Sequence, residues 1–349
     1  MKHILGFFIL IFSFLQCQTS QKIAAIVPLN ERQQIIFLDS ATAAAAIILD
    51  TTDHLFEKIQ PLDMSIQLKK PLKMPVNRNS ILSQYQLFLK KDVVSFTKTE
   101  QQYVQKAFLE ASNLVSQIST QILPKEIKLI KTKANHYGKS VYYTRENCII
   151  IPKNVLETQD YDEFMSTMMH EIFHIYSRFN PEKRKKLYAL IGFKNLPQKD
   201  LTIEDSLRQR ILLNPDGVDF AQFIDIQACK SCKKISAVPI IFANQFDYTT
   251  EKPDFFNYLT FNIFQIEKQG KHAYQVYSKR NGDPLLNVAQ MPSFNEQIGD
   301  NTGYIIHPDE ILADNFMLLC LKNKTPDRIN KLSQNGKELL EKIRLIIQS

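Results

Sequence analysis

Three residues whose types and spacing could perform metal chemistry lie close together at His170, Glu171 and His174, in an H-E-x-x-H arrangement. On a helix, positions i and i+4 lie on one face, about 40° apart, so both histidines can direct imidazole nitrogens at one metal ion. Glu171 can then reach a metal-bound water from the side, accept its proton and deliver it to a leaving amine. The motif therefore predicts one zinc ion held by both histidines, with Glu171 as general base and acid.

The surrounding segment decides how much weight this motif carries, because a chain with seven histidines can contain the pattern by chance. Apolar spacing predicts a helix over about residues 160–179, with Asp160 near its start and Asn180-Pro181 ending it. The centre of this segment is rich in Met, Ile and Phe, which predicts a helix buried on most sides. Histidines and a glutamate buried there are costly without a partner, and a metal ion is such a partner.

The third ligand separates the known classes of H-E-x-x-H proteins. One class continues the motif as H-E-x-x-H-x-x-G-x-x-H; here Ser177 and Asn180 occupy the glycine and final histidine positions, which excludes that class. The chain instead resembles the thermolysin-like gluzincin metallopeptidases, which take a glutamate from a later helix and have an aspartate four residues further on. The run Glu310-Ile-Leu-Ala-Asp314 has that form. The resemblance implies that Glu310 binds zinc and that Asp314 hydrogen-bonds a metal-binding imidazole.

The resemblance is confined to the two predicted ligand helices, and a long segment lies between them. Within this segment, approximately residues 200–300 combine aromatic and β-branched runs with Gly and Asn turns, which predicts several antiparallel strands. This β-rich segment would be an insertion between the ligand helices. Glu204 competes with Glu310 as the third ligand because it is nearer to the motif, but Arg208 stands four residues after it where an acid is expected.

Periodicity and capping signals predict the elements that position this site. Thr97 or Thr99 can begin a helix over residues 97–122, which Pro124 would end. Pro308 suits the first position of the second ligand helix. The other expected elements are a strand at "EIKLI", a hairpin of "VYYT" and "CIIIP", and helices over about 181–190 and 326–346. The resemblance also implies that strand 148–151 is an edge strand that pairs with an extended peptide.

Hydrolysis of this kind also needs a group that stabilises an oxyanion. Tyr304 and His307, just upstream of Glu310, are the nearest candidates, and Arg178 and His272 are weaker ones. Each also has a structural interpretation, and His307 in particular could cap its helix.

Composition and charge favour a folded globular protein that does not bind nucleic acid. The chain has 349 residues, of which 44% are hydrophobic and 23% charged, with a net charge of +7. Basic residues are scattered, and the densest run, Lys183-Arg184-Lys185-Lys186, accompanies no nucleic-acid-binding motif. We interpret this run as the solvated face of a helix.

The N-terminus predicts export. Lys2 and His3 precede an apolar run over residues 4–15 that is too short to span a bilayer, and Cys17 follows it. Residues 1–16 therefore resemble a lipoprotein signal peptide with Cys17 as the lipidated residue, although Phe14 and Gln16 depart from the usual pattern. Simple secretion and an uncleaved anchor are the alternatives. In each case the chain lies outside the cytoplasm, with a periplasmic, membrane-anchored protein expected.

The remaining cysteines and histidines carry weaker signals. Cys229 and Cys232 could form a local disulfide in an oxidising compartment or remain ordinary thiols, and no second pair completes a zinc ribbon. His54 and His136 are expected in loops without a partner pattern.

Together these features predict an α+β fold. We expect an N-terminal α/β region over residues 18–95 and a zincin-like catalytic domain over residues 96–349 that contains the β-rich insertion. The predicted function is a zinc-dependent peptidase acting on a peptide or protein substrate. The alternatives are a non-catalytic zinc-containing binding lipoprotein on a peptidase-like fold and a cell-wall amidase.

Overall fold

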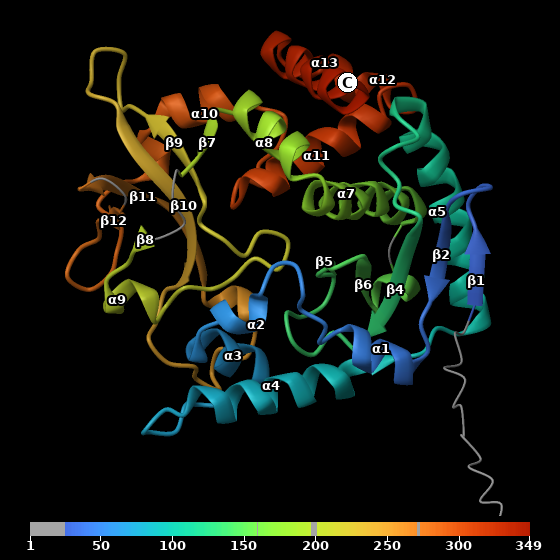
Figure 1. Cartoon of the computed structure of the whole chain (residues 1–349), viewed down its shortest axis with the longest axis horizontal. Helices are drawn as coiled ribbons and strands as arrows, with labels where there is room; N and C mark the ends of the chain where they lie inside the picture. Colours follow the sequence, from blue (N-terminus) through green and yellow to red (C-terminus); the bar gives the residue numbers. More distant parts are fainter. Residues whose placement is uncertain (1–24, 159, 197–200, 271–272) are drawn as a thin grey trace, which may run out of the picture.

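The computed structural model describes residues 25–158, 160–196, 201–270 and 273–349. It shows a mixed α+β fold with two sheets, as the sequence predicts (Figure 1). The expected signal segment with Cys17, and also His272, lie outside the described residues. Within the described residues, no helix is both long and apolar enough to cross a membrane.

The first sheet, at the right in Figure 1, has the strand order β1-β2-β4-β6-β5, and β3 pairs with β4. Its strands are β1 (Ala25–Pro28), β2 (Gln34–Phe37), β3 (Val93–Val94), β4 (Glu126–Thr132), β5 (Tyr143–Arg145) and β6 (Cys148–Pro152). β2, β4 and β6 run parallel, whereas β1 and β5 are antiparallel to their neighbours. Strands from both sides of the boundary expected at residue 95 therefore share one sheet.

Alternation of side chains along these strands creates two cores, one on each face of the sheet. Ile149 and Ile151 of β6 face the core formed with α5 (Lys98–Ile118) and α7 (Tyr161–Phe179). Ile150 faces the opposite core. The helices of that second core are α1 (Ser40–Ala46), α2 (Leu55–Lys58), α3 (Pro61–Leu68) and α4 (Arg78–Asp92).

Local capping accounts for the helices that the sequence analysis located best. Thr97 and Glu100 form a reciprocal capping box that begins α5. The side chain of Asp160 accepts hydrogen bonds from two backbone amides at the start of α7. Pro181 ends α7 by beginning α8 (Pro181–Leu190). These predicted helices are confirmed, although α5 ends at Ile118 rather than near residue 122.

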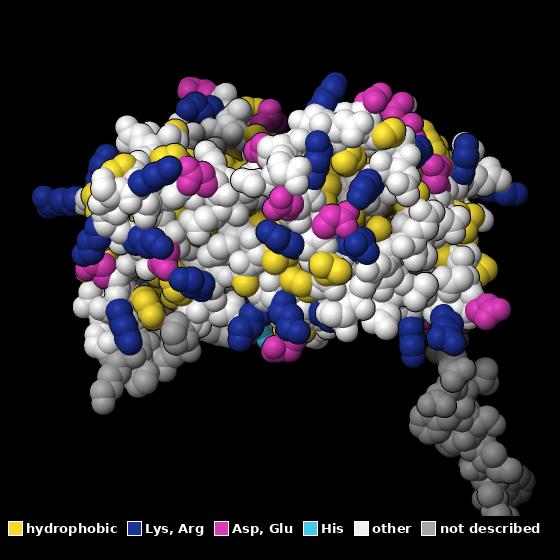
Figure 2. Space-filling model, turned by 90° about the horizontal axis from the view of Figure 1, so that it is seen from above, with side chains coloured by type: hydrophobic (Ala, Val, Ile, Leu, Met, Phe, Trp, Pro, Cys, Tyr) yellow, Lys and Arg dark blue, Asp and Glu magenta, His cyan; other side chains and the backbone are white. Residues whose placement is uncertain are grey.

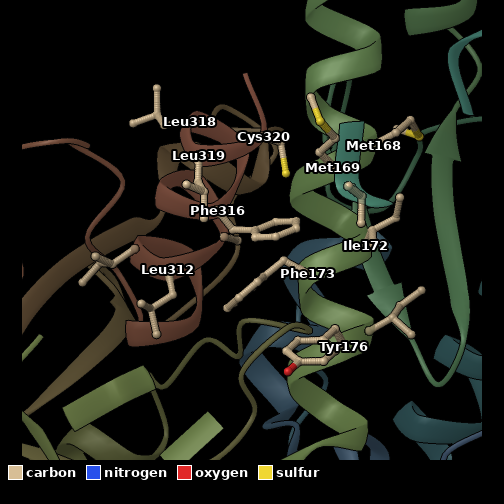
Figure 3. Packing of buried hydrophobic residues seen from close by; sticks show 14 of the residues in the cluster. Met168, Met169, Ile172, Phe173, Tyr176, Leu312, Phe316, Leu318, Leu319 and Cys320 are labelled. Atoms are coloured by element: carbon tan, nitrogen blue, oxygen red, sulfur yellow. The ribbon is translucent and has the colours of Figure 1, made fainter. Parts of the chain in front are cut away.

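The two ligand helices pack directly on each other. Pro308 begins α11 (Pro308–Cys320), and the rings of Phe173 and Phe316 meet with centroids 5.4 Å apart (Figure 3). Met169 and Ile172 of α7 are fully buried in the same core. Because this contact is apolar and close-packed, it holds α7 and α11 in one relative position.

The second sheet, at the left in Figure 1, occupies part of the chain between the ligand helices. Its order is β7-β9-β10-β11-β12-β8, with β7 (Phe193–Asn195), β8 (Leu201–Thr202), β9 (Gln222–Ile226), β10 (Ile235–Ala243), β11 (Leu259–Gln269) and β12 (Ala273–Val276). All pairs are antiparallel, as expected, except the pair of β12 and β8. The segment also contains the short helices α9 (Asp205–Arg208) and α10 (Pro292–Ile298). Cys229 and Cys232 form a disulfide.

Three local predictions are wrong. The predicted edge strand β6 is internal, because β5 pairs along its free side. The closing helix is divided into α12 (Pro326–Asn330) and α13 (Gln334–Gln348), because the side chain of Ser333 caps a new helix. His136 is no loop residue without partners: it is buried, with Nδ1 2.8 Å from Asp92 and Nε2 2.9 Å from the hydroxyl of Tyr143.

Surface charge is mixed, as the scattered basic residues suggest. On the face drawn in Figure 2, Lys and Arg side chains are interspersed with Asp and Glu side chains. Lys185 and Lys186 of α8 are exposed, in agreement with a solvated helix face.

Candidate metal centre

The side chains of His170, His174 and Glu310 converge where α7 meets α11. The two histidine Nε2 atoms lie 2.9 Å apart. Glu310 Oε2 lies 3.0 Å from the Nε2 atom of His170 and 3.2 Å from that of His174. All three side chains are at most 11% exposed. The structure thus brings together two nitrogens and one carboxylate oxygen that could hold a metal ion.

A carboxylate orients each imidazole from its other nitrogen. His170 Nδ1 lies 2.9 Å from Asp314, which also accepts a hydrogen bond from the hydroxyl of Thr302. The sequence analysis had predicted this contact of Asp314 with a metal-binding imidazole. A proton held between Nδ1 and the carboxylate leaves the lone pair of Nε2 available to a metal.

Asp309 holds the second imidazole, and sequence reasoning missed it. His174 Nδ1 lies 2.7 Å from Asp309, which also accepts hydrogen bonds from the hydroxyls of Ser177 and Tyr188. The position of Asp309 directly before Glu310 is a signal that could have identified it, since residues at the start of one helix face one stretch of the neighbouring helix.

Asn214 fixes the third ligand from a loop that sequence reasoning did not assign to the site. Its Nδ2 donates a 2.7 Å hydrogen bond to Glu310 Oε1, which leaves Oε2 directed at the histidines. The contact joins residues far apart in the chain and follows no periodicity, so no pattern in the sequence predicts it. Asp63 anchors the same loop, because its buried carboxylate accepts a 2.9 Å hydrogen bond from the amide of Leu213.

The electrostatics of the cluster favour bound cations. Burial lowers the pKa of His170, but its hydrogen bonds to Asp314 and Glu310 outweigh burial and raise that pKa to about 10. Burial raises the pKa of Glu310, but the charges and hydrogen bonds of the two histidines hold it well below its usual range. The cluster therefore holds protons strongly, and a divalent cation that binds there would displace them.

Glu171 lies beside the cluster with one carboxylate oxygen free of protein partners. The residue is 3% exposed, and its buried Oε2 makes no hydrogen bond within the described part of the chain. Burial raises the pKa of Glu171 to about 8, and the charge of Asp216 contributes to that rise. A buried carboxylate with a free oxygen and a raised pKa is suited to accept and release a proton near neutral pH.

A cavity of about 650 Å³ opens beside these residues. The described residues that line it include all three possible ligands, Glu171 and Asp314. Its lining includes Ser140, Val141 and Tyr142, which directly precede the edge strand β5, and the apolar residues Phe255, Phe256 and Leu259.

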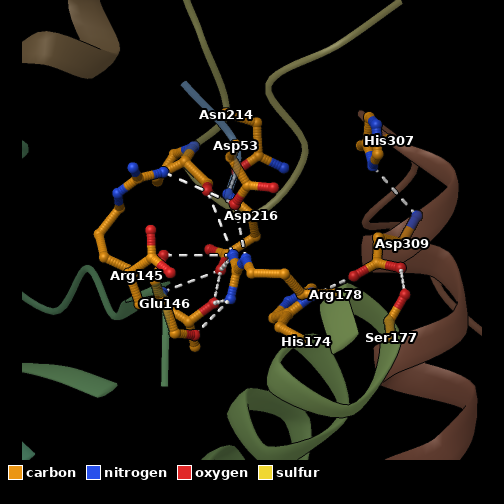
Figure 4. A network of polar contacts seen from close by, with 12 residues as sticks. Asp53, Arg145, Glu146, His174, Ser177, Arg178, Asn214, Asp216, His307 and Asp309 are labelled. Carbon is orange, nitrogen blue, oxygen red and sulfur yellow. Dashed lines mark hydrogen bonds and ion pairs between the residues drawn. The ribbon is translucent and has the colours of Figure 1, made fainter. Parts of the chain in front are cut away.

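Arg178 belongs to a buried ionic network rather than to the cavity wall (Figure 4). Its Nε donates a 2.6 Å hydrogen bond to Asp53, and its Nη1 donates to the hydroxyl of Thr144 and the carbonyl of Glu146. Its Nη2 lies 3.6 Å from Asp216. Arg178 thus ties α7 to β5 and to the loop that carries Asp216.

Of the other residues that the sequence suggested for the site, one lines the cavity and two do not. Tyr304 lines the cavity, and its ring lies against that of His170 with centroids 6.3 Å apart. His307 caps α11 by accepting a hydrogen bond from the amide of Asp309, which was one of its two predicted roles. Glu204 is exposed at the start of α9 and does not belong to the ligand group.

Searches with this chain among protein-family models, curated proteins and solved structures find no match. Its function must therefore be inferred from the geometry of the site itself.

Proposed function

We propose that this protein is a zinc-dependent hydrolase that cleaves peptide bonds. The observation that carries the proposal is the convergence of His170 Nε2, His174 Nε2 and Glu310 Oε2, with a carboxylate behind each imidazole. Two imidazole nitrogens and a carboxylate oxygen form a donor set that zinc takes in catalytic sites. A structural zinc site takes four protein ligands, whereas the group found among the described residues has three.

The unpartnered Oε2 of Glu171 supports catalysis rather than storage of a metal ion. Zinc, when bound, would lower the pKa of a water molecule and polarise a carbonyl group. In this mechanism Glu171 accepts a proton from the attacking water and delivers it to the leaving amine. Although Tyr304 is 44% exposed, loss of solvent around its hydroxyl and the charges of Glu310 and Asp216 raise its pKa above the ordinary value, so it keeps its proton at neutral pH. It is therefore the cavity residue suited to donate a hydrogen bond to the oxyanion.

The surrounding architecture is compatible with a zincin-like arrangement. An H-E-x-x-H helix lies over a mixed sheet, and a second helix supplies the acidic ligand (Figure 1). We place an extended substrate beside residues 140–142, which lead into the edge strand β5, instead of beside β6. The resemblance to gluzincin peptidases implies a substrate at the edge of this sheet, and because β5 rather than β6 occupies the edge, the placement moves to β5. The second sheet would be an insertion between the ligand helices.

The N-terminal sequence supports a position outside the cytoplasm. Export with lipidation at Cys17 would place the cavity at a membrane surface, where peptides or exported proteins are the available substrates.

Zinc content and turnover together test this proposal. We expect about one zinc per chain in the purified protein and clear loss of zinc in Glu310→Ala, whereas the matched variant Glu204→Ala keeps it. Glu171→Gln should keep zinc but lose on the order of 10³-fold in hydrolysis of a peptide library.

Each departure from this result has a defined meaning. Folded wild-type protein without zinc overturns the proposal. Full hydrolysis by Glu171→Gln overturns the mechanism. Zinc with no hydrolysis of any peptide would favour a binding lipoprotein.

A further inference from the structure

The cavity is acidic although the whole chain carries a net charge of +7. Five carboxylate residues line it, and no Lys or Arg occurs among the described lining residues. These five are Glu163, Glu171, Asp216, Glu310 and Asp314. One divalent ion offsets only two of these charges, so the loaded cavity stays negative as long as the imidazoles are neutral. Such a cavity attracts cationic groups and repels a free carboxylate.

The proposed metal chemistry uses neither Glu163 nor Asp216, and of these two Glu163 is exposed whereas the side chain of Asp216 is buried. Its side chain is 5% exposed, and its Oδ1 accepts hydrogen bonds from the amide and hydroxyl of Thr144. The nearest cation to Oδ1 is Arg178, at 3.6 Å. The printed contacts of the carboxylate all involve Oδ1, so among the residues that the structure describes Oδ2 has no hydrogen-bond or ion-pair partner, and the residue lines the cavity.

Neighbouring arginines do not neutralise Asp216 completely. Ion pairs run from Asp50 to Arg145, on to Asp53, then to Arg178 and finally to Asp216. This series contains three carboxylates and two guanidinium groups, so it carries one excess negative charge. Because Arg178 is closer to Asp53, at 2.6 Å, the excess lies toward Asp216, at the cavity end. A buried carboxylate without a full counter-charge is costly, and a ligand cation would offset that cost.

Asp216 also lies close to the reacting part of the site. It follows Asn214 by two residues, and Asn214 contacts Glu310. The backbone amide of Asp216 donates a 3.1 Å hydrogen bond to the side chain of Asn214, which makes this segment a compact turn. A group bound at Asp216 would therefore lie beside the metal ligands in the same cavity.

We propose that Asp216 is a specificity residue that binds an ammonium group of the substrate, carried by the peptide N-terminus or by a lysine side chain. This inference rests on the proposed function, because it concerns the substrate of the same cavity. The apolar wall of Phe255, Phe256 and Leu259 would then accept an uncharged part of that substrate.

Three hydroxamates that carry an ammonium group at different positions, or carry none, test the proposal by binding to the zinc-loaded full-length protein. Leucine hydroxamate carries an α-ammonium, Nα-acetyl-lysine hydroxamate carries a side-chain ammonium, and Nα-acetyl-leucine hydroxamate carries neither. Isothermal titration should show one ammonium ligand binding about tenfold or more tighter than the uncharged ligand, and its identity reveals the source of the charge. Asp216→Asn should remove this preference, while the control Asp219→Asn, on the same loop but outside the cavity lining, keeps it.

The outcomes separate this proposal from the proposed function. Equal affinities for all three ligands in the wild type overturn the ammonium subsite but leave the zinc site intact. A preference that survives in Asp216→Asn overturns the role of Asp216. Absence of zinc and of hydroxamate binding in the wild type overturns both proposals. If Asp216→Asn does not fold, Asp216→Ser, which also removes the charge, replaces it, and an unchanged ranking of the ligands in that variant again contradicts the assignment.

Discussion

The paired helices α7 and α11 and the loop of residues 211–218 contribute to the same cavity by different means. The helices supply all three possible metal ligands at positions fixed by helical spacing and by an apolar contact. The loop supplies Asn214 and Asp216, which polar contacts to distant parts of the chain hold in place. The difference indicates that packing positions the possible metal ligands, whereas hydrogen bonds position the loop residues to which we assign the support of Glu310 and the recognition of an ammonium group.

The largest expected effect comes from breaking the helix contact. Phe173→Ala should lower the free energy of unfolding by about 3–5 kcal/mol, because it leaves a void opposite Phe316 in a fully buried core. Chemical denaturation followed by circular dichroism measures this change. Leu345→Ala on α13, where the leucine is 59% exposed, is the matched control and should change stability little. Equal losses in both variants would contradict a packing origin for the position of the ligands.

An intermediate effect is expected from the polar support of the ligands. Asp309→Asn keeps an oxygen for His174 but removes the charge, so zinc affinity should fall by about 10- to 100-fold. Competition with a chromophoric chelator measures the dissociation constant.

Asn214→Ala provides the corresponding change in the loop. It removes one hydrogen bond to Glu310, and its expected loss of zinc affinity is smaller than that of Asp309→Asn. A larger loss in Asn214→Ala would mean that the loop, rather than the helices, determines the metal site.

A further effect concerns the anchor of the loop and depends on pH. Burial raises the pKa of Asp63 to about 7, against an ordinary value of 3.8. The folded state therefore holds a proton that the unfolded state releases, and stability falls as pH rises from about 4 to about 7. The slope from this group is at most about 1.4 kcal/mol per pH unit.

Asp63→Asn should remove that contribution while keeping an acceptor for the amide of Leu213. Denaturation of both proteins at several pH values measures the difference, which should grow in favour of the variant up to pH 7 and then stay constant. Parallel stability curves would show that Asp63 does not titrate in this range.

The sequence predicts what depends on neighbouring residues. Thr97, Asp160 and Pro181 locate helix ends because capping acts within one turn. The i, i+4 spacing of Glu310 and Asp314 likewise leads to a ligand and its support. These relations need no knowledge of the rest of the fold.

What the sequence could not predict depends on pairing between distant segments. β5 takes the edge position from β6 only once the hairpin has closed on the sheet. The burial of His136 against Asp92 joins a loop to the end of α4. The contact of Asn214 with Glu310 joins a loop to a helix nearly a hundred residues away, so local sequence patterns do not predict it.

The order of the ligands along the chain has a consequence for biosynthesis. A ribosome completes α7 with both histidines, and then the entire second sheet, before it reaches Glu310. Truncated or unfinished chains therefore carry two histidines and no acidic partner. A ligand group divided in this way is complete only after α11 has docked on α7, so an unfinished chain that lacks α11 cannot form it.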